Sequence, residues 1–249
     1  MSTNDAASSR DGGARAHWDR VYSAQAVDEI PEDDDVGAAA RKHFGDLAGR
    51  RLLDLGCGAG EYSLFFARAG ANVTAVDTSA VAVSHLQEYC GERGITNVRA
   101  VVSDAFDIAA LGPFDAAFGS MILHHLEPFD RFVDVLADSL DPGGRAFFYE
   151  NSAMSRTLVW CREHLAGRFG IPKYGDDDEF PLQPQEVDAF RRRFDVDVEY
   201  PELFLARLAS AYVLRGHGEE ACAWIDEKLY RFPRVRRLSY RQYVRLARR

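Results

Sequence analysis

The sequence predicts an α/β fold in which helices cover both faces of a mostly parallel sheet. From residue 51 onward, short apolar segments with strand composition alternate with amphipathic helices, which is typical of a sheet covered on both faces. A glycine-rich turn follows the first strand, as in sheets that bind ligands at their carboxyl edge. The chain of 249 residues is long enough for one large domain of this kind.

Seven segments have the composition of strands. They are Arg51–Leu55, Asn72–Asp77, Val98–Val102, Phe114–Gly119, Gly144–Glu150, Phe194–Tyr200 and Leu238–Leu246. Helices are expected near residues 16–25, 36–47, 61–69, 80–90, 128–140 and 218–230. The Asp-Pro-Gly-Gly sequence at 141–144 predicts a turn that leads into the fifth strand.

The pattern predicts a single domain over residues 16–249, preceded by a disordered leader at residues 1–15. The alternation stops after residue 150, and residues 151–237 are expected to hold a cap over the substrate. Seven aromatic residues of this segment fit either an apolar pocket or the core of the cap. They are Trp160, Phe169, Tyr174, Phe180, Phe204, Tyr212 and Trp224.

Composition and charge limit the classes of partner. Hydrophobic residues make up 47% of the chain and charged residues 28%, which is usual for a globular protein. A net charge of -9 disfavours nucleic acid as a partner, because that binding depends on clustered Lys and Arg. The tail at 231–249 is different: it has eight Arg and no Asp or Glu, and fits either a solvated surface or a site for an anionic partner.

Cysteine spacing and hydropathy predict a cytoplasmic protein without a metal centre or an integral membrane segment. The four cysteines lie far apart and form no CxxC pair. The first 16 residues lack the apolar stretch of a secretory signal, and no run approaches the roughly 18 apolar residues of a membrane span.

The most informative motif is the glycine-rich turn. Gly56, Gly58 and Gly60 stand at alternate positions directly after the apolar strand. Glycine allows a tight turn and a close approach of the backbone to a ligand, and the following helix offers N–H groups to an anionic atom. The spacing G-x-G-x-G differs from the G-x-G-x-x-G of dinucleotide-binding proteins, which disfavours a dehydrogenase.

An acid ends the second strand. Asp77 is placed to accept both hydroxyl groups of an adenosine ribose. The alternative is a helix N-cap, a position for which Thr78 and Ser79 compete.

The third and fourth strands end in further polar residues. Asp104 is placed to accept an adenine amino group, with Ala105 and Phe106 against the ring. Ser120 follows the fourth strand at the same edge of the sheet. In an open parallel sheet, ligands bind outside these carboxyl ends.

Five motifs in succession resemble those of class I S-adenosylmethionine-dependent methyltransferases, in the branch that acts on quinones, sugars, lipids and natural products. They are DLGCGAGEYS, AVDTS, SDAFD, FDAAFGSMILHHL and LDPGGRAFFYEN, and the resemblance covers about residues 18–151. It implies a three-layer sandwich with a seven-stranded, mostly parallel sheet whose last strand is antiparallel. It also implies S-adenosylmethionine as cofactor and S-adenosylhomocysteine as product.

By position, the resemblance implies that the methionine part of the cofactor faces Asp54 and the glycine loop, and that Ser120 lies beside the sulfonium. Trp18 and Tyr22 would close over the cofactor, or pack in the core. The residues assigned to cofactor binding are Tyr22, Asp54, Gly56, Cys57, Gly58, Gly60, Asp77, Thr78, Asp104, Ala105, Phe106 and Ser120.

His124 and His125 follow the fourth strand, beside the expected methyl donor. An imidazole removes a proton from a hydroxyl group near neutral pH, so both are candidate catalytic residues. Proteins of the resembled family keep a histidine at the second position whatever their substrate. We therefore interpret His124 as the better candidate for a general base.

The predicted reaction is O-methylation of a small-molecule metabolite. N- or C-methylation of a metabolite, lipid or quinone is the first alternative. Methylation of an RNA or DNA base is disfavoured, because residues 119–122 read Gly-Ser-Met-Ile where adenine methylases have an Asn-Pro-Pro-Tyr type of motif. A cofactor-binding scaffold without catalysis is the alternative from another class, and the intact glycine loop together with His124 disfavours it.

Overall fold

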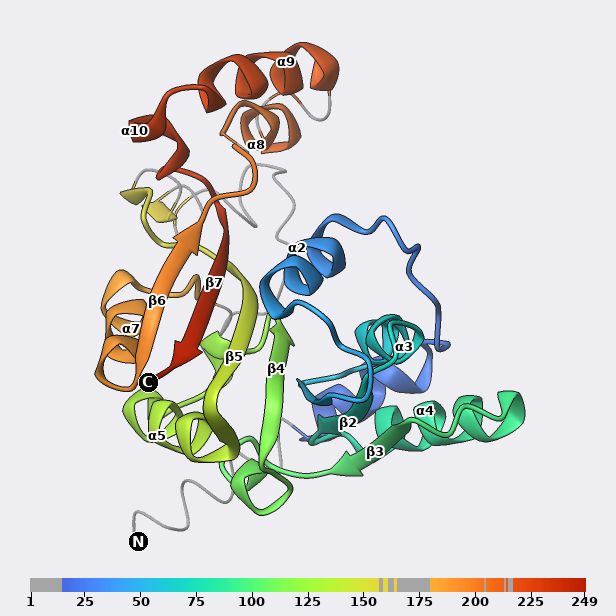
Figure 1. Ribbon diagram of the computed structural model, residues 1–249. Helices are drawn as coiled ribbons and strands as arrows, with labels where there is room; N and C mark the ends of the chain where they lie inside the picture. The colour runs from blue at the N-terminus through green and yellow to red at the C-terminus, as the bar shows by residue number, and fades with distance from the viewer. Residues whose placement is uncertain are drawn as a thin grey trace, which may run out of the picture.

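The computed structural model describes residues 15–249, apart from 157–158, 161–163, 165–179, 204, 213 and 215–216. Seven strands form one sheet in the order β3-β2-β1-β4-β5-β7-β6 (Figure 1). The strands are β1 (Arg51–Leu55), β2 (Asn72–Asp77), β3 (Val98–Val102), β4 (Phe114–Ser120), β5 (Leu140–Asn151), β6 (Phe194–Glu199) and β7 (Arg241–Arg248). Only β7 runs antiparallel to its neighbours, β5 and β6. The predicted seven-stranded, mostly parallel sheet with an antiparallel last strand is confirmed.

Helices cover both faces of this sheet and complete the three layers. One face carries α2 (Asp35–Phe44), α3 (Glu61–Arg68) and α4 (Ala80–Arg93), and the other carries α5 (Phe129–Ser139) and α7 (Pro184–Ala189). Short 3-10 turns, η1 (Ile108–Ala110), η2 (Leu123–His125) and η3 (Phe190–Arg192), join these elements.

Alternate residues of the central strands point to opposite faces, and both sets are apolar. Leu52 and Phe118 belong to the core under α2 and α3, whereas Leu53 and Ala117 belong to the core under α5. All four are fully buried. Because both faces of a parallel sheet are covered, its strands read as continuous apolar runs, which is why the sequence locates them so well.

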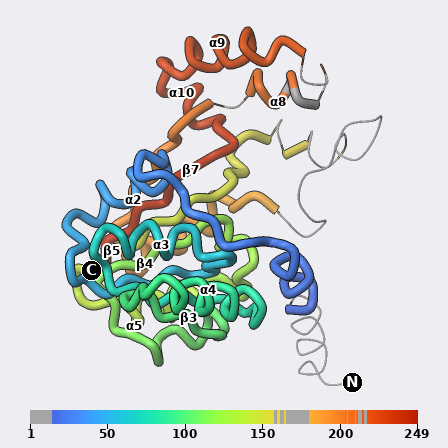
Figure 2. Tube along the Cα trace, turned by 90° about the vertical axis from the view of Figure 1, so that its right-hand side faces the viewer, coloured from blue at the N-terminus to red at the C-terminus, as the bar shows by residue number. Residues whose placement is uncertain are grey.

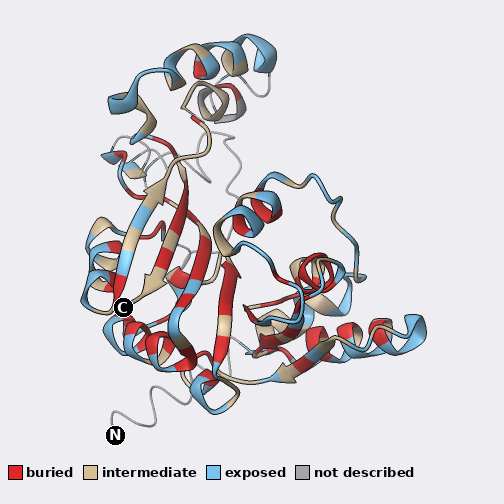
Figure 3. Cartoon of the chain, in the orientation of Figure 1, coloured by how far each residue is buried: buried red, intermediate tan, exposed pale blue. Residues whose placement is uncertain are grey.

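A cap of three helices lies between β6 and β7, at the carboxyl edge of the parallel strands. The helices are α8 (Leu205–Tyr212), α9 (Glu219–Tyr230) and α10 (Pro233–Arg236). The ribbon and the tube both show them as a tier beyond the end of the sheet (Figures 1 and 2). Their outer surface is largely exposed, in contrast to the buried central strands (Figure 3). No helix in the described part of the chain is long and apolar enough to cross a membrane.

The strand bounds of β1, β2 and β3 agree with the prediction residue for residue. By contrast, β5 begins at Leu140, so the predicted turn at 141–144 lies inside it, and β7 covers Arg241–Arg248 instead of 238–246. Helix α4 continues beyond Cys90 to Arg93, because the left-handed residue that ends it is Gly94, with φ 66°.

The predicted leader and the predicted role of the cap aromatic residues agree with the structure only in part. Arg15, placed in the leader by the sequence, already begins a helix over residues 15–23, while residues 1–14 lie outside the described part. Among the cap aromatics, Phe169, Tyr174 and Phe204 also lie outside it, and the Tyr212 side chain is not described. Trp160, Phe180 and Trp224 are 52%, 57% and 60% exposed, so they form neither a core nor a closed pocket.

Candidate functional site

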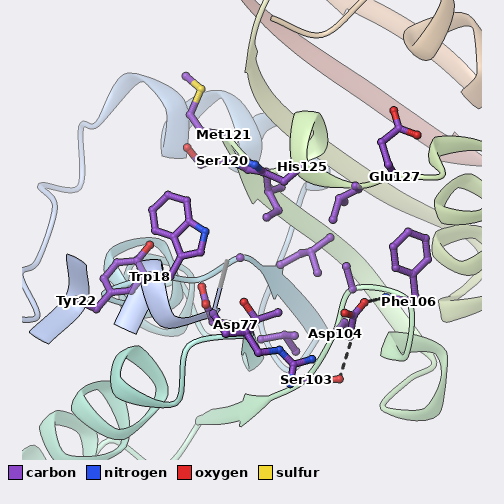
Figure 4. A pocket seen from close by; sticks show the side chains of 18 residues that line it. Trp18, Tyr22, Asp77, Ser103, Asp104, Phe106, Ser120, Met121, His125 and Glu127 are labelled. Atoms are coloured by element: carbon purple, nitrogen blue, oxygen red, sulfur yellow. Dashed lines mark hydrogen bonds between the residues drawn. The ribbon is translucent and has the colours of Figure 1, made fainter. Parts of the chain in front are cut away.

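A cavity of about 390 Å³ opens at the carboxyl ends of β1 to β4, at the switch point of the sheet. Side chains from the N-terminal helix, from the ends of β2 and β3, and from the segment after β4 converge on it (Figure 4). The residues in its wall are Arg15, Trp18, Tyr22, Leu55, Gly56, Val76, Asp77, Thr78, Ser103, Asp104, Ala105, Phe106, Ser120, Met121, Ile122, His125, Leu126 and Glu127.

The glycine loop turns the chain from β1 into α3. The N–H groups of Gly56 and Cys57 both donate to the Val76 carbonyl, at 2.8 and 3.0 Å, which fixes the loop against β2. Gly60 is the N-cap of α3 with φ 87°, and a Cβ there would lie 2.4 Å from Leu86 Cδ1. A side chain at this position is therefore excluded by both backbone conformation and space.

The Asp77 carboxylate lies at the centre of the cavity floor. Its Oδ2 accepts the Gly58 N–H at 2.9 Å and its Oδ1 accepts the Ser79 N–H at 2.8 Å, which ties β2 to the glycine loop. The capping role of the next helix falls to Ser79, whose Oγ accepts the Ala82 N–H. Burial raises the pKa of Asp77, and the backbone N–H groups of Ser79 and Gly58 oppose this rise.

The far end of the cavity is formed by residues after β3. Asp104 Oδ1 accepts the Phe106 N–H at 2.8 Å, a local turn that presents both side chains to the cavity. Phe106 packs edge-on against Phe132, and the Arg131 guanidinium lies 4.7 Å from its ring centre. This end of the wall therefore combines a carboxylate with an apolar ring.

The N-terminal helix lies across the cavity. Trp18 stacks on Tyr22, with ring centres 5.9 Å apart, and meets His125 edge-on at the same distance. The helix is attached beside Asp77, because Asp19 Oδ1 accepts the Ser79 hydroxyl at 2.6 Å. Trp18 thus spans the cavity from the glycine loop to the segment after β4.

Tyr22 lies directly against the glycine loop. A Cβ at Gly58 would be 2.7 Å from the Tyr22 hydroxyl, so only glycine allows this close approach. Burial, followed by the Asp77 carboxylate, raises the pKa of Tyr22. The Tyr22 hydroxyl is therefore neutral at physiological pH and available as a hydrogen-bond donor.

Four of the residues predicted to bind cofactor lie outside the cavity wall: Asp54, Cys57, Gly58 and Gly60. The Asp54 side chain points beneath the loop, where its Oδ2 accepts the Ser63 hydroxyl at 2.5 Å. Full burial raises the pKa of Asp54 to about 7, and the hydrogen bond from Ser63 opposes this. The structure thus places Asp54 under the loop instead of facing the cavity, and Tyr22 lies between Gly58 and the open space.

The two histidines occupy different places. His125 lines the cavity, whereas the His124 side chain is 5% exposed and is absent from the wall. Its Nδ1 lies 2.9 Å from Oε2 of Glu150, a fully buried carboxylate on β5 whose Oε1 accepts the Leu123 N–H. The two imidazole rings are 4.1 Å apart.

Sequence reasoning missed several residues of the site. Met121, Ile122, Leu126 and Glu127 all lie in the segment that follows β4, and the rule that ligands bind at strand ends would have selected them. Glu150 and Asp19 have no such signal, since each acts through a partner distant in the chain. Within the described residues, no group of three His, Cys, Asp or Glu side chains is arranged to hold a metal ion.

Comparisons with known proteins agree with this geometry. Residues 52–144 match the family model described as a methyltransferase domain. A methyltransferase from Mesorhizobium loti, dependent on S-adenosylmethionine, shares the fold with a TM-score of 0.57 and 18% identity, over 88% of this chain and 100% of its own. The chain therefore has the class I methyltransferase fold, and its residues 52–144 are similar to a methyltransferase domain.

Curated relatives include the ubiquinone biosynthesis O-methyltransferases of Burkholderia lata, 31% identical over 159 residues, and Xylella fastidiosa, 36% identical over 158 residues. Each alignment covers 61% of this chain, and 66% and 63% of the two relatives. The chain thus matches just under two thirds of the length of these relatives. The methyltransferase match contains the glycine loop, Asp77, Asp104 and both histidines, and the cap lies outside it.

Proposed function

We propose that this protein transfers the methyl group of S-adenosylmethionine to an oxygen atom of a small-molecule acceptor. The observation that carries the proposal is the order of groups along one cavity: Tyr22 at the glycine loop, Asp77 in the middle, and Asp104 with Phe106 at the far end. This order fits the methionine, ribose and adenine parts of the cofactor. The names of the curated O-methyltransferases support oxygen as the accepting atom.

The hydrogen-bonding capacity of Asp77 fits a ribose. A carboxylate has about four acceptor positions, and two of them are filled by the N–H groups of Gly58 and Ser79. About two positions remain for the two ribose hydroxyl groups. Asp104 would accept an adenine amino hydrogen while Phe106 and Ala105 contact the ring, and the neutral Tyr22 hydroxyl would donate to the methionine carboxylate.

Methyl transfer requires an aligned nucleophile and a group to accept its proton. S-adenosylmethionine, when bound, supplies a methyl group on a positively charged sulfur, which a nucleophile displaces in line. His125 lines the cavity and would pass the proton of the acceptor on to His124, whose ring centre is 4.1 Å away and which we assign as the final base. Glu150 holds its Nδ1, so Nδ1 carries the hydrogen and Nε2 is the basic nitrogen. His125, in the cavity wall, helps to position the acceptor, and proximity and orientation provide most of the acceleration.

Isothermal titration of S-adenosylmethionine into Asp77→Ala tests the cofactor site. Loss of two hydrogen bonds to a carboxylate should weaken binding by about 2 to 4 kcal/mol. Because burial raises the pKa of Asp77, wild-type affinity should also fall as the pH falls through that pKa, whereas Asp77→Asn should lack this dependence.

The matched control is Asp115→Ala. Asp115 lies at the opposite end of the sheet, where it pairs with Arg51 at 3.2 Å, and cofactor affinity should be unchanged. Equal affinity in folded Asp77→Ala and wild-type protein would remove Asp77 from the site and contradict the proposed arrangement.

A further inference from the structure

Arg241 is the first residue of β7 and lies close to the end of the cavity. In the sheet it pairs with Asn151, the last residue of β5. Its Nη1 donates to Asn151 Oδ1 at 2.7 Å and contacts the Met121 sulfur at 3.6 Å. The guanidinium carbon lies 5.4 Å from the ring centre of Tyr149 and 5.8 Å from that of Tyr240.

Met121 connects this arginine to the proposed site of methyl transfer. Met121 and Ser120 both line the cavity, and Figure 4 shows their side chains at the same end of it as His125. Met121 has a positive φ of 53°, and its N–H donates to the Tyr149 carbonyl at 2.9 Å. The Arg241 guanidinium therefore contacts a side chain of the cavity wall.

The charge of Arg241 is not neutralised within the described protein, where no carboxylate lies within 4 Å of its guanidinium. Other arginines near the cap differ in this respect. Arg245, on the same strand, pairs with Asp197 and Glu199, both at 2.6 Å, and Arg207 pairs with Glu202 at 2.7 Å. A partly buried cation with neutral neighbours favours an anionic ligand.

The geometry of Arg241 suits such a ligand. Its backbone N–H donates to the Ser239 hydroxyl at 3.0 Å, and Asn151 holds Nη1, so the planar group is already oriented. The Nε and Nη2 hydrogens form the fork that binds two oxygens of a carboxylate or phosphate in parallel. With a net charge of -9, the protein as a whole repels an anion, so an acidic acceptor needs a local cation of this kind.

We propose that Arg241 binds an acidic group, a carboxylate or a phosphate, on the methyl acceptor. The inference rests on the proposed function, since it places the anion beside the wall where methyl transfer would occur. Arg241 is then a specificity-determining residue, and the acceptor belongs to the class of hydroxy acids or hydroxyaryl phosphates.

The test compares acids with their neutral esters in the presence of saturating S-adenosylhomocysteine. Calorimetry would measure the binding of a panel of hydroxybenzoates, their methyl esters and a hydroxyphenyl phosphate to wild-type protein, Arg241→Gln and Arg241→Lys. In Arg241→Gln, binding of the preferred acid should weaken about 10- to 100-fold, because hydrogen bonds to a charged group are lost. Its ester should bind equally well to both proteins. A larger effect on the phosphate than on the carboxylates would identify the acidic group as a phosphate.

The control is Arg245→Gln, which removes a cation that already has two acidic partners and should leave the preference for acids unchanged. Equal weakening of acid and ester in Arg241→Gln would show that the arginine only supports the fold and would overturn the proposal. So would a wild-type protein that prefers no acid of the panel over its ester. Failure of the wild-type protein to bind S-adenosylhomocysteine would instead contradict the proposed function.

Discussion

The carboxylates of the cavity wall and of the cap accept their hydrogen bonds in different ways. In the wall, Asp77 and Asp104 each accept a backbone N–H from a residue two positions later, in the loop that follows a strand. In the cap, the buried carboxylate of Asp226 on α9 accepts the N–H groups of Ala206 and Arg207, at 2.8 and 3.0 Å, at the start of the neighbouring helix α8. The wall thus combines these short loop contacts with the bond from the Gly58 N–H to Asp77, whereas the cap depends on contacts between helices.

The largest expected effect concerns the His124–Glu150 pair, which joins the segment after β4 to β5. A positioned general base typically contributes roughly 10²- to 10⁴-fold, so His124→Ala should lower the turnover number by that factor. Cofactor affinity should be nearly unchanged, because His124 is outside the cavity wall. Steady-state kinetics with the true acceptor, together with calorimetry, would measure both.

His125→Ala is the matched variant. It should raise the KM for the acceptor and also lower turnover, because His125 lines the cavity in front of His124. Full turnover in His124→Ala would show that orientation alone carries the reaction. A loss of turnover confined to His125→Ala would transfer the role of base to the exposed histidine.

The second prediction concerns Asp54, beneath the glycine loop. Its pKa in the folded protein is about 7, above the ordinary value of 3.8. Between these values the unfolded chain has lost the proton and the folded protein retains it, so wild-type stability falls as the pH rises through this window. The stability of Asp54→Asn should not fall in this pH window, because asparagine does not ionise. Its free energy of unfolding relative to wild type should rise from pH 4 to pH 7 by about 3 kcal/mol, as measured by urea denaturation.

Asp115→Asn provides a control of opposite sign. The neighbouring Arg51 lowers the pKa of Asp115, so this carboxylate stabilises the folded protein above its ordinary pKa and loses that contribution in acid. The variant should be less stable than wild type at pH 7, and the difference should shrink as the pH falls. A pH-independent difference for Asp54→Asn would show that Asp54 is ionised in the folded protein.

The same contrast explains how much the sequence could predict. The strands β1 to β3 and the positions of Asp77 and Asp104 follow from apolar runs and turn residues, which are local signals. The role of Glu150 could not be predicted, since its partner His124 is 26 residues earlier and their contact depends on the pairing of β4 with β5. Asp54 was assigned to the ligand because its motif places it near the loop, but motif position does not determine which way a side chain points.

A third prediction tests whether the cap is independent of the wall. Asp226→Ala removes the acceptor of two N–H groups and leaves Arg207 with a weaker pairing, which should destabilise the cap by about 2 to 3 kcal/mol. Hydrogen exchange should accelerate in α8 and α9 but not in the glycine loop, and cofactor affinity should be unchanged. A parallel loss of cofactor affinity would contradict the division of the molecule into two regions.

The smallest expected effect concerns the outer surface of the cap. Trp224 on α9 is 60% exposed, and its only described ring contact is Lys228, whose Nζ lies 5.6 Å from the ring centre. Because little apolar area is buried there, Trp224→Ala should change the free energy of unfolding, measured by urea titration, by no more than about 0.5 kcal/mol.

The matched variant is Phe118→Ala, in the buried core of the sheet, which should cost about 3 to 5 kcal/mol in the same urea titration. Since the two variants remove large aromatic side chains from opposite environments, their difference measures how far burial distinguishes the two regions. A loss near 2 kcal/mol in Trp224→Ala would mean that the cap in solution packs its outer aromatic residues against other groups, and that its surface is not the exposed face drawn in Figure 3.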